Sequence, residues 1–277
     1  MTAVILATAC AVVYGTADFF GGLATRRTQV LSVVVLSQLA GLALILGLLP
    51  VLPGAFSDRA ILWGLAAGLS GAAGLALFYR ALATGVMSVV APTTAVTSAA
   101  LPVVFGLATG ERPGFWALAG VVLALGSVLL VSQDRTAGGH TSLGALVTSL
   151  AAGAGFGGFF ILLAMAPAEA GLWPLVGARL SSVTSVVLVA LVARRSLMPR
   201  PGSLRIIMAA GVLDMAANVL YLLAQRQGLL SLVAVLVSLY PASTLLLARQ
   251  VLGERLNTIQ VTGVACALGA VALIAVA

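Results

Sequence analysis

Long apolar runs follow one another along almost the whole chain, and they constrain its fold more than any other feature. Each run is close to the roughly 20 residues that an α-helix needs to cross the hydrocarbon core of a bilayer. The ten runs cover residues 3–24, 30–52, 60–84, 86–108, 114–132, 143–166, 172–193, 205–225, 229–251 and 258–277. Short segments rich in Pro, Gly or charged residues separate most of them. We therefore expect an all-α integral membrane protein with ten transmembrane helices.

The scarcity of charge excludes other classes of protein. Charged residues make up 8% of the 277 residues, whereas a soluble domain has about 25%. So few charges cannot cover the surface of a soluble enzyme. The 14 cations are all arginine and are scattered along the chain, so no basic domain suggests a nucleic-acid partner. A β-barrel is excluded because its strands are about 10 residues long and alternate polar with apolar residues.

A shift of 143 residues aligns the second half of the chain with the first. In this register Gly110-Glu111-Arg112 falls on Gly253-Glu254-Arg255, and Gly85 falls on Gly228. The match of the tripeptides is informative because charged residues are so rare here. We expect a first five-helix repeat over residues 1–138 and a second over residues 139–277.

Five spans per repeat have a consequence for topology. Because five is odd, the second repeat must insert upside down relative to the first. Inverted repeats are the arrangement from which many secondary transporters build two alternating gates around a central site. The repeat therefore favours transport by alternating access over a structural or receptor role.

Two stretches resemble a known family. The first contains Phe78-Tyr79-Arg80-Ala81-Leu82, Gly85, Pro92 and Gly110-Glu111-Arg112-Pro113, and the second contains Tyr221, Gly228, Tyr240-Pro241 and Gly253-Glu254-Arg255. Both are similar to the EamA-type repeat of the drug/metabolite transporter superfamily. The resemblance implies a central cavity lined mainly by the first, third, fourth, sixth, eighth and ninth helices. It also implies transport of small metabolites or drugs, often by export. At the first helix the chain departs from the family's common Trp-Gly, because Tyr14-Gly15 stands there.

The distribution of arginine predicts an orientation. Four arginines would lie on the side of the two termini, and the other ten on the opposite side; the four are Arg59, Arg112, Arg179 and Arg226. Arginine-rich short loops stay in the cytoplasm. The count therefore predicts both termini outside the plasma membrane, whereas the family resemblance implies both inside.

A polar stripe marks the eighth span. Asp214, Asn218, Tyr221 and Gln225 follow one another at a spacing that places them on one helix face. One interpretation is a cavity wall that binds a polar substrate. The other is a seam of hydrogen bonds between helices, which is common in membrane bundles.

Charged residues inside spans are costly and usually face a cavity or a partner. Asp18 shares a face of the first span with Tyr14 and lies at a depth similar to that of Arg80. Asp214 lies near the depth of Arg179. We therefore expect two acid–arginine pairs, Asp18 with Arg80 and Asp214 with Arg179. Each pair would hold a gate or bind a zwitterion.

Prolines within the fourth and ninth spans suggest bends. Pro92 and Pro102 flank a run of hydroxyl residues, and Pro241 follows Tyr240. Intramembrane prolines kink helices, so these positions are candidate gate or hinge residues. Equally, Thr93 and Thr97 would simply bond to the backbone. The glycines of the third and sixth spans suggest close helix packing.

No pattern points to catalysis or to a cofactor. His140 is the single histidine, and Cys10 and Cys266 lie far apart in apolar runs, which predicts small buried residues rather than a metal pair. Clustered acids, a catalytic triad and a nucleotide-binding motif are missing from the sequence. We expect no enzyme activity, no cofactor, no metal and no ATP drive.

These observations predict a secondary transporter, with export favoured, for small polar or amphipathic metabolites. The expected partners are the substrate and membrane lipid, without nucleic acid. Proton coupling is an open option, with Asp18 or Asp214 as the carrier, and the oligomeric state is open. Alternatives are multidrug or cation efflux, a lipid flippase and, less favoured, a membrane enzyme that acts on lipid. The predicted substrate-binding residues are Tyr14, Asp18, Arg80, Arg179, Asp214, Asn218 and Tyr221.

Overall fold

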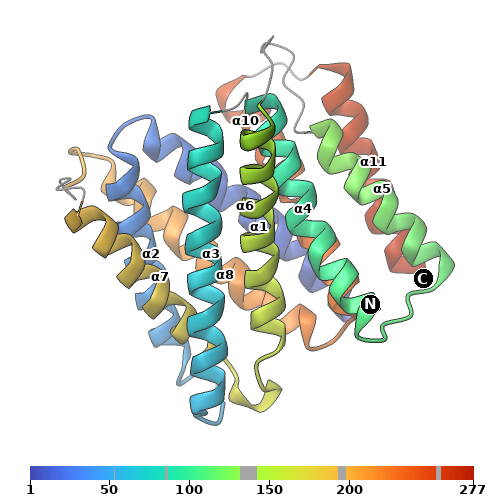
Figure 1. Ribbon diagram of the computed structural model, residues 1–277, viewed down its shortest axis with the longest axis horizontal. Coiled ribbons are helices and arrows are strands. Elements are labelled where there is room, and N and C mark those ends of the chain that lie inside the picture. Colours follow the sequence, from blue (N-terminus) through green and yellow to red (C-terminus); the bar gives the residue numbers. More distant parts are fainter. Residues whose placement is uncertain (53, 85–86, 132–141, 193–197, 254–256) are drawn as a thin grey trace.

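The fold is seen in a computed structural model that describes residues 1–52, 54–84, 87–131, 142–192, 198–253 and 257–277. Throughout these residues the chain is helical, without a strand, which confirms the all-α class (Figure 1). The elements are α1 (Thr2–Thr25), α2 (Val30–Leu48), α3 (Asp58–Thr84), α4 (Met87–Ala108), α5 (Phe115–Val131), α6 (Leu143–Ala164), η1 (Ala168–Ala170), α7 (Trp173–Val192), α8 (Leu204–Gln225), α9 (Leu230–Val237), α10 (Tyr240–Leu252) and α11 (Thr258–Val276).

The helices are long and apolar enough for a membrane. Within the described residues nine spans meet both criteria, with α9 and α10 together forming one of them over Leu230–Leu252. Helix α5 is apolar but has only 17 residues. Many large hydrophobic side chains are exposed on the outer surface, where lipid rather than water would suit them. The chain is therefore a multi-pass membrane protein, and the exact number of ten spans stays a prediction.

The expected ninth span is interrupted. Helix α9 ends at Val237 and α10 begins at Tyr240, with Pro241 in its first turn. Proline suits this position because its missing N–H would have no partner there. Helix α4 instead runs without interruption through Pro92 and Pro102. A bend of α4 at these prolines therefore stays a prediction.

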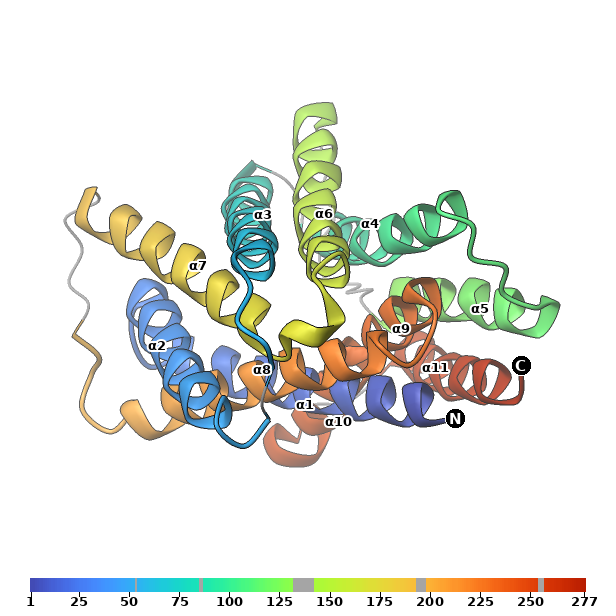
Figure 2. The ribbon, with the colours of Figure 1, turned by 90° about the horizontal axis from the view of Figure 1, so that it is seen from below.

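The two halves of the chain interleave. The most extensive pairings each join one helix of α1–α5 to one of α6–α11, and they include α3 with α6, α1 with α8, α5 with α11, α3 with α7 and α4 with α6. Figures 1 and 2 both show α5 beside α11 at one edge, with the two termini close together. Neither half forms a compact unit by itself.

Glycines permit these close pairings. A Cβ added at Gly177 of α7 would lie 2.6 Å from the carbonyl oxygen of Ile61 in α3. A Cβ at Gly155 of α6 would lie 2.6 Å from Cα of Gly74. Small residues let helix backbones approach in this way within membranes. The expectation that glycines of the third and sixth spans form packing surfaces is confirmed at Gly74 and Gly155, and Gly177 of α7 is a further example.

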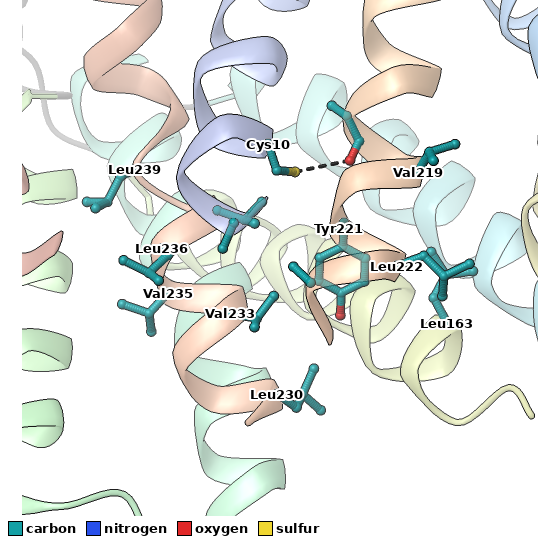
Figure 3. Packing of buried hydrophobic residues seen from close by; sticks show 14 of the residues in the cluster. Cys10, Leu163, Val219, Tyr221, Leu222, Leu230, Val233, Val235, Leu236 and Leu239 are labelled. Atoms are coloured by element: carbon teal, nitrogen blue, oxygen red, sulfur yellow. Dashed lines mark hydrogen bonds between the residues drawn. The ribbon is translucent and has the colours of Figure 1, made fainter. Parts of the chain in front are cut away.

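Packed hydrophobic residues fill the end of the bundle that holds the termini. Figure 3 shows side chains of α1, α8 and α9 meeting there, and the Cys10 thiol donates a hydrogen bond to the carbonyl of Ala217 over 3.1 Å. Cys10 is fully buried, as expected, and Cys266 is partly buried. Leu236 and Leu222 are also buried in this cluster.

A carboxylate joins the two halves at the same end. Glu111, in the loop after α4, accepts hydrogen bonds from the backbone N–H of Leu230 over 2.6 Å and of Ser231 over 3.0 Å. These amides begin α9, where free N–H groups and the helix dipole favour a negative charge. The glutamate of the repeated Gly-Glu-Arg motif thus caps a helix of the opposite half. Glu254, its counterpart in the sequence, lies outside the described residues.

Candidate functional site

A cavity lined by charged, polar and aromatic residues lies between the two halves. Its volume is about 350 Å³, and α1, α2, α3, α4, α6, α7, α8 and α10 line it. A second cavity of about 380 Å³ shares several lining residues with the first, among them Asp18 and Tyr240. All helices that the resemblance implied contribute to the lining. Helices α2 and α7 line it as well, which the sequence had not indicated.

Arg179 of α7 anchors the polar part of the cavity. Its guanidinium donates hydrogen bonds to the carboxylate of Asp214 on α8 and to the amide oxygen of Gln38 on α2. The Ser182 hydroxyl also donates to Gln38, over 3.3 Å, and the Asn218 side-chain amide donates to the backbone carbonyl of Asp214 over 2.8 Å. The expected pair of Asp214 and Arg179 is confirmed, with Gln38 as an additional partner.

The two members of this pair differ in exposure. The Arg179 side chain is 10% exposed and the Asp214 side chain is 39% exposed. Gly41 of α2 lies against Arg179, where a Cβ would come within 3.3 Å of the guanidinium Nε. The arginine is therefore enclosed by neighbouring helices, whereas the carboxylate of Asp214 still faces the cavity.

Asp18 faces both cavities and forms no ion pair among the described residues. The expected pair with Arg80 does not form, because Arg80 lies exposed on α3, outside the lining of both cavities. Helix α3 packs on α6 and α7, while α1 packs on α8 and α10. Similar depth therefore did not bring the two residues together.

Two tyrosines line the first cavity together with Asp18. The rings of Tyr14 and Tyr240 have centroids 6.2 Å apart and are tilted by 51°. Gly15 allows this approach of α1 to α10, because a Cβ there would lie 2.6 Å from the carbonyl oxygen of Tyr240.

The polar stripe of α8 is part cavity wall and part hydrogen-bonded seam between helices. Asp214 and Asn218 line the cavity. Tyr221 is fully buried, its hydroxyl donates to the carbonyl of Phe160 over 2.8 Å, and the two rings lie 4.6 Å apart. At this depth α6 packs directly on α8, so Tyr221 belongs to a seam between helices and lies outside the cavity.

The hydroxyl residues of α4 mostly bond to backbone. Thr97 donates to the carbonyl of Thr93 over 2.8 Å, and Thr94 donates to that of Ser149 on α6 over 3.1 Å. Ser98 lines both cavities, and Pro241 lines the second. His140 lies outside the described residues, among which no group of three or more potential metal ligands occurs.

A helical membrane bundle around a central cavity with buried charges is an arrangement that many secondary transporters share. Residues 143–276 match the model of the EamA-like transporter family. This match over the second half of the chain supports an EamA-type transporter of the drug/metabolite transporter superfamily, in agreement with the sequence resemblance.

A solved structure supports the fold over nearly the whole chain. It is described only as the crystal structure of a protein, and it superposes with a TM-score of 0.81 at 17% sequence identity. The similarity covers 99% of this chain and 98% of the other. Comparison with curated proteins finds no match.

Proposed function

We propose that this transporter carries a small polar or amphipathic molecule by alternating access, with the cavity between the two halves as its binding site. The observation that carries this proposal is the cavity itself, which is lined by Asp18 and by the bonded pair of Asp214 and Arg179. Ionisable groups in such a place are costly unless function requires them.

The arrangement of helices supports two inverted repeats. Exchange of α1–α5 with α6–α11 converts the pairing of α3 with α6 into that of α1 with α8. In the same way, the pairing of α3 with α7 becomes that of α2 with α8. Such internal symmetry suits a site that two mirrored gates open in turn. The buried cluster around Tyr221 and Leu236 would be the closed gate at the end that holds the termini.

The test is uptake into proteoliposomes. Purified protein would be reconstituted and offered amino acids, sugars and organic cations, with and without a pH gradient. We expect saturable uptake of at least one class, and loss of that uptake in the Asp214→Ala variant. Uptake no faster than in protein-free liposomes for every class would contradict the proposal.

Export and orientation are part of the proposal and need separate measurement. The arginine count favours termini outside the cytoplasm, and a reporter that is active only in the cytoplasm, fused to each terminus, distinguishes the two orientations. Stimulation of uptake by a pH gradient, lost in Asp18→Asn, would support a proton carrier at Asp18. Unchanged coupling in that variant would leave Asp214 as the candidate.

A lipid flippase is the second candidate, because the wall of the cavity contains many apolar groups. The rings of Phe156, Phe159 and Phe160 all line it. A fluorescent phospholipid in the same proteoliposomes tests this alternative: protein-dependent exchange between leaflets, without uptake of soluble molecules, would favour it.

A further inference from the structure

Resting on the proposed transport function, we propose that the Asp18 end of the cavity is a subsite for the cationic group of the substrate. The subsite consists of Asp18 and the rings of Tyr14 and Tyr240. The substrate class is therefore an organic monocation with an apolar body, rather than an anion or a zwitterion.

The charges of the cavity carry the first step. Among the described lining residues, the ionisable groups of acids and bases are Asp18, Asp214 and Arg179. Arg179 is neutralised by its bonded partner Asp214, while Asp18 has no cationic partner in the part of the chain that the structure describes. Asp18 also lies within electrostatic reach of Asp214. A ligand with one positive charge would therefore balance the carboxylate of Asp18, whereas an anion would add a negative charge next to two carboxylates.

The aromatic rings carry the second step. Tyr14 precedes Asp18 by one helical turn, so both side chains lie on the same face of α1. Tyr240 faces Tyr14 at 6.2 Å between ring centroids and lies within electrostatic reach of Asp18. The faces of aromatic rings attract cations within about 6 Å. A carboxylate next to two tilted rings suits an alkylated ammonium group.

The remaining lining defines the rest of the ligand. Phe156, Phe159 and Phe160 of α6 line the same cavity and would contact an apolar or aromatic body. Arg179 is nearly buried and already bonded to two side-chain acceptors, so it has little capacity left for a substrate carboxylate. The expectation that Asp214 and Arg179 bind a zwitterion therefore gives way to a structural role for Arg179.

Calorimetry on the purified full-length protein in detergent tests the subsite with two probes. Benzyltrimethylammonium supplies the cation and the aromatic body, and phenylmethanesulfonate supplies the same body with an anionic group. We expect the cation to bind and the anion not to bind. Asp18→Asn should weaken cation binding by about tenfold or more. Tyr240→Leu should weaken it by a smaller factor, and Tyr240→Phe should largely retain it. Asp58→Asn, exposed at the start of α3, is the matched control and should bind like wild type.

Three results would overturn the inference. They are equal or tighter binding of the anion, cation affinity unchanged in a folded Asp18→Asn variant, and no binding of the cation at all. If Asp18→Asn fails to fold, the difference between Tyr240→Leu and Tyr240→Phe decides instead, and equal affinities in these two variants count against the subsite. Uptake of only neutral or anionic molecules into proteoliposomes would refute the subsite and leave the transport proposal intact. Cation binding that depends on Asp18, without any uptake, would support the subsite and contradict the transport proposal.

Discussion

The buried pair of Arg179 and Asp214 allows a quantitative test of what holds the centre of this bundle together. Replacing Asp214 by Ala leaves a guanidinium that is 10% exposed with Gln38 as its remaining side-chain acceptor. Loss of one partner of a buried ion pair costs about 3–5 kcal/mol. Because Gln38 stays bonded to the guanidinium and the Asp214 side chain is already 39% exposed, we expect a loss near the lower end, about 3 kcal/mol.

The double variant Asp214→Ala/Arg179→Met should be compared with Asp214→Ala, because it also removes the charge of the arginine. Methionine keeps much of the length of the arginine side chain without its charge, so no uncompensated ion remains. We expect the double variant to be more stable than Asp214→Ala alone, with a coupling free energy of about 1–3 kcal/mol. Melting of the purified proteins in one detergent gives the ranking, and Asp58→Ala, an exposed acid at the start of α3, is the control.

Additivity would refute this reasoning. If the double variant melts as low as the sum of the two single losses predicts, the two side chains contribute independently, and the hydrogen bond between them does not stabilise the fold. Restoration by Asp214→Asn, which keeps an acceptor but no charge, would show that hydrogen bonding rather than charge is decisive.

Three further predictions concern single positions, each measured by melting. Glu111→Ala should cost about 1–2 kcal/mol because the first turn of α9 loses its cap, and hydrogen exchange there should accelerate; exposed Glu169→Ala should change neither. Tyr221→Phe should lower the free energy of unfolding by about 0.5–1 kcal/mol and leave the KM for substrate unchanged. A raised KM would indicate that Tyr221 contacts the substrate. Gly177→Ala should lower the free energy of unfolding by about 1–3 kcal/mol through overpacking. Gly22→Ala, whose added Cβ would meet no atom within 4 Å, should be neutral or slightly stabilising. Equal effects of the two substitutions would contradict the packing argument.

The spans were predictable because lipid leaves a chain few options. Backbone polar groups in hydrocarbon must bond internally, so a long apolar run becomes a helix of nearly the same length. The run expected at residues 205–225 is helix α8, Leu204–Gln225. Pro241 predicted a bend in the ninth span, but the full interruption of the helix at Ser238 and Leu239 was not predicted, because apolar residues continue through it.

Depth in the membrane predicted only one of two charge pairs. Asp214 and Arg179 both line the cavity, whereas Asp18 lines it and Arg80 lies exposed on another face of α3. A sequence gives the depth of a residue but not the direction in which its helix face points. The single amide within the second span, Gln38, was an available signal of a partner for Arg179 and was overlooked.

The interleaved packing of the two halves has a consequence for how the protein is made. A ribosome delivers α1–α5 to the membrane before α6–α11 exist, yet the most extensive partners of the early helices all belong to the late ones. Glycine-lined helix faces, such as the one around Gly74, therefore remain in contact with lipid until α6 has been synthesised and inserted. Assembly is therefore postponed to the end of synthesis, and contacts between distant segments slow folding. A chain truncated after α5 would lack its main packing partners and should not fold stably. The two halves expressed as separate fragments in one membrane should associate and form the complete bundle.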